Sequence, residues 1–126
     1  MGDFDFGWRR DLGLASRRES GELAGSPWAI LSFAETSIHH ENRCLWRFVV
    51  FAPGEARRAP VLSVDLEKDI LGDFCLSLAS GGKRRILEHL GASAPSYEDF
   101  KARALAAAGA ALAASTDRGG GTGSAD

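Results

Sequence analysis

Four short apolar runs, separated by turn-forming residues, constrain the fold of this chain most strongly. They cover residues 28–38, 44–52, 61–67 and 74–79. Runs of this length that are rich in β-branched and aromatic residues are typical of strands. The first two are divided by a polar cluster at 39–43, which predicts a hairpin, and the close spacing of the last three favours antiparallel pairing. We therefore predict a four-stranded antiparallel meander.

The run at 61–67 alternates between apolar and polar side chains. The apolar set is Leu62, Val64 and Leu66, and the polar set is Ser63, Asp65 and Glu67. Successive side chains of a strand point to opposite faces, and a shift of one residue would exchange the two sets. We expect the apolar set to face the core and the polar set to face water.

The segment 83–90 is open to two interpretations. Ile86, Leu87 and Leu90 have the spacing of one helix face, and Gly91 could cap the end of a helix. This favours a short helix. A fifth strand over 85–90 is the alternative, because eight residues are too few for periodicity to decide.

A longer helix is predicted from Tyr97 to about Ala114. Ser96 and Asp99 resemble a capping box at its start, and an apolar side should pack across the sheet with Phe100 as its main anchor. The apolar side comprises Tyr97, Phe100, Ala104, Leu105, Ala108 and Leu112. The glycine-rich and polar sequence from Ser115 onward lacks an apolar face, so we expect a disordered tail.

These elements predict an α+β protein with a sheet of four to five strands and a C-terminal helix on one face. We divide the chain into an irregular arm (1–26), a single α+β domain (27–114) and a disordered tail (115–126). The length of 126 residues, with 44% hydrophobic and 25% charged residues, suits one such domain.

Composition limits the cellular setting and the partners. Cys44 and Cys75 lie in apolar runs, where we expect reduced, buried thiols. The N-terminus does not resemble an export signal, so we expect a cytoplasmic location. No apolar stretch is long enough to cross a membrane. Fifteen basic and seventeen acidic residues give a net charge of −2, which does not predict a strong attraction to nucleic acid.

Candidate chemistry centres on carboxylates and histidines, but no motif is complete. Asp65 and Glu67 could share a cation or act as an acid and base, with His39 or His40 as a further group. The spacing after Asp65 does not fit a calcium loop, and no set of three or four residues has the spacing of a zinc site. We therefore predict no metal and no cofactor.

By elimination, we predict a non-enzymatic binding or protein-interaction domain. The alanine-rich helix is nearly smooth all round, so it or a sheet edge could meet a partner or a second copy in a homodimer. One alternative is a metal-dependent or acid-base enzyme that uses the exposed carboxylate face, with Asp65, Glu67, His39 and His40 as candidates. Another is a single-stranded nucleic-acid-binding domain that uses five basic residues, namely Arg57, Arg58, Lys83, Arg84 and Arg85.

Overall fold

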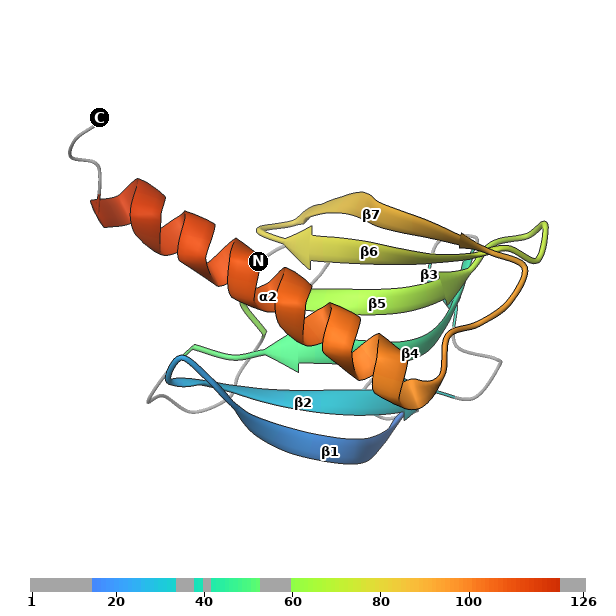
Figure 1. The fold of residues 1–126 in the computed structure, drawn as a ribbon, viewed down its shortest axis with the longest axis horizontal. Helices are drawn as coiled ribbons and strands as arrows, with labels where there is room; N and C mark the ends of the chain where they lie inside the picture. Colours follow the sequence, from blue (N-terminus) through green and yellow to red (C-terminus); the bar gives the residue numbers. More distant parts are fainter. Residues whose placement is uncertain (1–14, 34–37, 40–41, 53–59, 121–126) are drawn as a thin grey trace.

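In the computed structural model, the described residues form an antiparallel sheet that a long helix crosses on one face (Figure 1). The structure describes residues 15–33, 38–39, 42–52 and 60–120. The strands are β1 (Ala15–Leu23), β2 (Ser26–Phe33), β3 (Ile38–His39), β4 (Asn42–Val50), β5 (Leu62–Lys68), β6 (Phe74–Ser80) and β7 (Lys83–Gly91). The helix is α2 (Tyr97–Gly120).

The sheet is a meander in the order β1-β2-β4-β5-β6-β7, and the short β3 pairs with β4 beside this path. Every neighbouring pair is antiparallel. The predicted α+β class and antiparallel meander are therefore confirmed, and the sheet contains more strands than the four or five expected.

The first additional strand lies within the segment 1–26, for which an irregular arm was expected. β1 pairs with β2 through a two-residue turn, Ala24-Gly25, in which both residues have positive φ. Such turns match the twist of antiparallel strands. Most of the side chains of β1 are exposed, so the strand lacks the apolar alternation by which the other strands were predicted.

The second additional strand is β7, which corrects the helix favoured over 83–90. It pairs with β6 through a turn at Gly81-Gly82, and its register shifts at two irregularities. A bulge adds a residue to one strand and interrupts its alternation. Leu87 and Leu90 consequently pack toward the helix-side core while Ile86 is 53% exposed, and this broken alternation produced the helix-like spacing.

The core between the sheet and α2 follows the predicted helix face. Phe100, Ala104 and Ala108 are all fully buried against the sheet. The ring of Trp46 contacts Phe100 with 5.4 Å between the ring centroids, and it meets Tyr97 edge-on at 5.5 Å. These contacts lie near the start of α2, so they fix the helix on the sheet close to its N-terminus.

Both ends of α2 bear on the predictions. The backbone N–H of Asp99 donates to the Ser96 hydroxyl at 3.1 Å, which confirms the N-cap. The Asp99 carboxylate accepts from Arg103. The helix continues to Gly120, beyond its predicted end near Ala114 and into the segment 115–126 for which a disordered tail is predicted, and residues 121–126 lie outside the described part of the chain.

The face of the sheet opposite α2, here called the far face, is also buried. A second apolar cluster lies there, made of Ala29, Leu31, Phe33, Cys44, Val49 and Phe51. Cys44 and Cys75 are both free and buried, as predicted. Burial raises the pKa of both thiols, which keeps them in the neutral form.

Candidate functional site

Asp65 and Glu67 lie in the middle of the sheet, on β5, and both are buried. Asp65 is 0% exposed and Glu67 is 3% exposed. The predicted alternation is correct, because Leu62, Val64 and Leu66 all belong to the core beneath α2. The expected exposure of Ser63, Asp65 and Glu67 is wrong, since the far face is buried as well. The water-exposed carboxylate face on which the candidate enzyme site depended is therefore absent.

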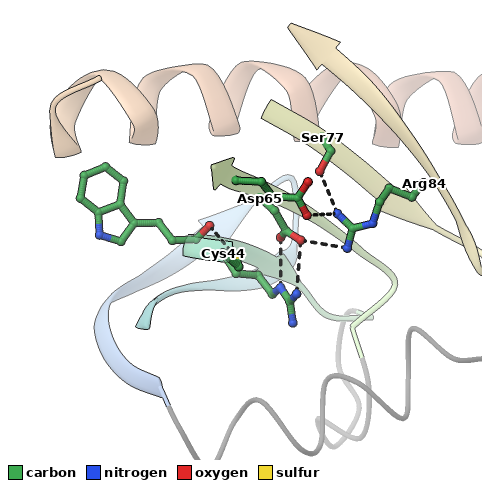
Figure 2. Close-up of polar contacts among 7 residues, drawn as sticks. Cys44, Asp65, Ser77 and Arg84 are labelled. Carbon is green, nitrogen blue, oxygen red and sulfur yellow. Dashed lines mark hydrogen bonds and ion pairs between the residues drawn. The ribbon is translucent and has the colours of Figure 1, made fainter. Parts of the chain in front are cut away.

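The Asp65 carboxylate is held by two arginines. Arg47 lies directly opposite on β4 and donates through Nε to Oδ1 at 3.0 Å and through Nη2 to Oδ2 at 3.3 Å. Arg84 reaches in from β7 and donates to Oδ2 at 3.2 Å. Figure 2 shows these guanidinium groups converging on Asp65. A paired arrangement with two parallel hydrogen bonds is the strong geometry for arginine and carboxylate.

Arg84 also links the neighbouring polar groups into a network. Its Nη1 donates to Glu67 Oε2 at 2.6 Å and to the Ser77 hydroxyl at 2.8 Å (Figure 2). The side chain of Arg47 is 1% exposed and that of Arg84 is 23% exposed. Two guanidinium groups thus compensate the two carboxylates within a largely buried layer. Such compensation is required where charges are removed from water.

This network joins β4, β5, β6 and β7 and leaves little room for chemistry. A general base needs a carboxylate that a substrate can reach. Asp65 and Glu67 instead are buried and bind arginine side chains of their own sheet. We therefore interpret the role of the network as structural, because its side-chain ion pairs and hydrogen bonds connect neighbouring strands of the sheet. The sequence held one signal for it, because Arg47 is the lone charged residue of the apolar run 44–52. In the structure it lies opposite Asp65.

The remaining predicted candidates are His39 and His40, and Asp69 is a further acidic residue that follows β5. His39 lies in β3, opposite Asn42 of β4, and His40 lies outside the described residues. Asp69 accepts from the backbone N–H groups of Leu71 and Asp73 at 2.9 Å each, so it closes the turn between β5 and β6. Within the described ranges, no group of three His, Cys, Asp or Glu residues could hold a metal ion.

The basic triplet of β7 divides between the two faces of the sheet. Arg84 points into the far-face network. Arg85 pairs in register with Leu78, which belongs to the helix-side core, so Lys83 and Arg85 project on the α2 side. Both are exposed. Arg57 and Arg58 lie outside the described residues, so the predicted basic groove is represented here only by β7.

A groove of about 390 Å³ lies beneath the C-terminal half of α2, beside the start of β7. Its apolar lining includes Leu62 and Leu78 from the sheet and Ala111 and Leu112 from the helix, and Arg85 lies in its wall. Val61, which also lines the groove, is 42% exposed. Sequence reasoning did not predict this groove, because it forms between segments that are distant along the chain.

No family model matches the chain, and no curated protein and no solved structure matches it either. In the described part of the chain, no helix is both long enough and apolar enough to cross a membrane. The functional proposal therefore depends on the geometry of the molecule itself.

Proposed function

We propose that this protein is a non-enzymatic interaction domain that binds a protein partner along β7 and the adjacent groove. The observation that carries the proposal is the position of β7. It is the last strand in the order of the described sheet, and one of its sides is therefore free to pair with another strand. An extended segment of a partner can add to such an edge through backbone hydrogen bonds.

The side chains of β7 support this use of the edge. Lys83, Arg85 and Ile86 are exposed, and Ile86 places a large apolar side chain in water at 53% exposure. The groove beside the start of the strand adds further apolar surface. A free edge next to an apolar depression offers backbone pairing for affinity and side-chain contacts for specificity.

A second copy of the chain is less suited to this edge than a different protein. Two antiparallel β7 strands paired about Arg84 would place Lys83 of one copy opposite Arg85 of the other. Like charges opposite one another destabilise a strand pair. We therefore assign β7 to a different partner. The homodimer through α2 that the sequence suggested is not part of the proposal.

The proposal assigns no catalytic role to Asp65, Glu67, His39 or His40. It includes a cytoplasmic setting, which the two free, buried thiols support because a reducing compartment keeps cysteines unpaired.

The test is selection from a displayed library of random linear peptides against the immobilised full-length protein. We expect Ile86→Glu and Val61→Glu each to abolish capture of the selected peptides, because both place a charge on the proposed surface. The matched control is Ser16→Glu, which adds the same charge to the exposed edge strand β1. All three positions lie at the surface, so the melting temperatures should stay close to that of the wild type.

Two results would contradict the proposal. One is the failure of the wild type to retain any peptide. The other is equal capture by Ile86→Glu and the wild type, which would place the binding surface elsewhere.

A further inference from the structure

The charges around β7 are unbalanced. Glu88, an acidic residue of the strand, is already bound by Arg103 of α2, whose Nη1 donates to it at 2.6 Å. The side chains of Lys83 and Arg85, by contrast, make no ion pair or hydrogen bond with any residue whose placement the structure describes. Two cations are therefore left for a ligand on the same side of the strand.

The register of β7 determines where a bound strand would place its side chains. Lys83 and Arg85 are two residues apart, so an added strand would place two of its own residues opposite them, also two apart. The residue next to one of these would lie opposite Ile86, on the other side of the sheet. This relation holds whether the added strand runs parallel or antiparallel to β7.

We infer that the ligand of β7 is an extended acidic peptide segment. It carries two carboxylates at alternating positions and a large apolar residue next to the carboxylate that faces Arg85. Opposite charges in directly facing positions stabilise a strand pair, and apolar side chains in such positions pack on each other. The exposed Ile86 would pack on the apolar residue of the peptide, and Lys83 and Arg85 would pair with its two carboxylates. The inference rests on the proposed function and specifies its ligand.

An extended peptide fits the observations better than other anionic ligands do. A nucleic acid would meet basic side chains without using the strand edge or Ile86. A fatty acid could place its chain in the groove and its carboxylate at Arg85, but it would leave Lys83 and the backbone of β7 unused. Only a peptide satisfies the edge, the two cations and the apolar residue together.

The experiment measures binding of fluorescent eight-residue peptides to the full-length protein by anisotropy. The test peptide contains the symmetric pattern apolar, acid, neutral polar, acid, apolar, which brings an apolar residue opposite Ile86 whether the peptide runs parallel or antiparallel to β7. The control peptide has the same composition with its two acids adjacent, so that they point to opposite sides of an extended strand. We expect the control to bind about tenfold more weakly, which corresponds to the loss of the cross-strand ion pairs.

Exchanging the charges between the protein and the peptide gives a more specific test. Lys83→Glu combined with Arg85→Glu should weaken binding of the acidic peptide at least tenfold, and a peptide with lysines in place of the acids should bind this variant in preference to the wild type. Both substituted residues are exposed, so an unchanged melting temperature would show that the fold is retained.

The outcomes separate this inference from the proposed function. Equal binding of the two acidic peptides, or no rescue by the lysine peptide, overturns the inference. Comparable binding of an oligonucleotide or a fatty acid at Lys83 and Arg85 also overturns it. If the displayed library yields only neutral peptides that depend on Ile86, the interaction function stands and the acidic ligand is excluded. If no peptide binds, both fail.

Discussion

The two outer strands of the sheet, β1 and β7, are held in different ways. β1 is fastened to the start of α2, where Glu19 accepts from the Tyr97 hydroxyl at 2.9 Å and from Lys101, and Arg18 lies over the Tyr97 ring at 4.1 Å. β7 is held by the Arg84 side chain, which points into the far-face network and binds Asp65 and Glu67. Among the described residues, the exposed first half of β7 makes no comparable side-chain hydrogen bond to α2. The first turns of α2 therefore hold side chains of β1, whereas α2 holds β7 through the pair Arg103–Glu88 and leaves the first half of β7 exposed.

The direction of α2 explains this difference. The helix crosses the sheet obliquely, as Figure 1 shows, so its two halves cannot serve the two edges equally. Its first turns carry the aromatic contacts of Tyr97 and Phe100 and the ion pair with Glu19. Its later turns border the groove beside β7. The helix α2 thus contacts one edge strand through its first turns and borders a groove beside the other edge strand with its later turns.

The largest predicted effect concerns the anchor of α2. Phe100→Ala should lower the free energy of unfolding by about 3–5 kcal/mol, because the side chain is fully buried between helix and sheet. Leu112→Ala, at the groove, should lower it by less than half as much, since Leu112 is only partly buried. Urea denaturation measures both. Equal losses would mean that the two halves of α2 are docked alike.

The next pair of substitutions compares the ion pairs that hold the two edge strands, β7 and β1. Arg84→Met should cost about 2–3 kcal/mol, because it removes a donor from Asp65 and Glu67, and these carboxylates stay buried. Glu19→Gln should cost less than Arg84→Met, since the Glu19 side chain is 34% exposed and water screens its ion pair with Lys101. Chemical denaturation of the two variants side by side checks this order. A reversed order would show that the ion pair of Glu19 in β1 contributes more stability than those of Arg84 in β7.

A third pair of substitutions compares the surfaces of the two strands. A Cβ at Gly21 of β1 would lie 2.6 Å from Cζ2 of Trp28, and the Trp28 ring is itself stacked on Phe48. Gly21→Ala should therefore cost about 1–2 kcal/mol through overpacking. Ile86→Ala of β7 should change stability by less than about 0.5 kcal/mol. Thermal unfolding that shows a larger loss for Ile86→Ala would contradict the open edge.

The smallest effect is the pH dependence of the stability that the Glu19 carboxylate of β1 contributes. Hydrogen bonds from Lys101 and Tyr97 lower the pKa of Glu19 below its ordinary value of 4.5. A carboxylate whose pKa is lowered by folding adds stability above its unfolded pKa, and that stability is lost as the pH falls through the folded pKa. Wild type should melt above Glu19→Gln at pH 6, and the difference should shrink below pH 4.5. A constant difference would exclude this titration.

The sequence predicted the parts of the fold whose signals are local. Alternation and apolar runs indicated β2, β4, β5 and β6, and Ser96 indicated the start of α2. β1 was missed because an exposed edge strand needs no apolar face, and β7 was misassigned because its bulges break the period of two. These two strands are the edges on which the functional proposal now depends.

The burial of Asp65 and Glu67 was also beyond local reasoning. The alternation of β5 separates its side chains into two sets, but it does not state whether the second face is covered. That depends on the whole far face, where the arginines come from β4 and β7. The groove shares this property, since it is created by the position of α2 relative to distant strands.

The most direct measurement is residue-resolved amide hydrogen exchange of the full-length protein, free and with the selected peptide bound. In the free protein, the outward-pointing amides of β7 should exchange fast. On binding, they should become protected at alternating positions from Lys83 onward, and the amides of β1 should not change. Protection that rises at β1, or no new protection along β7, would contradict the assignment of β7 as the binding edge.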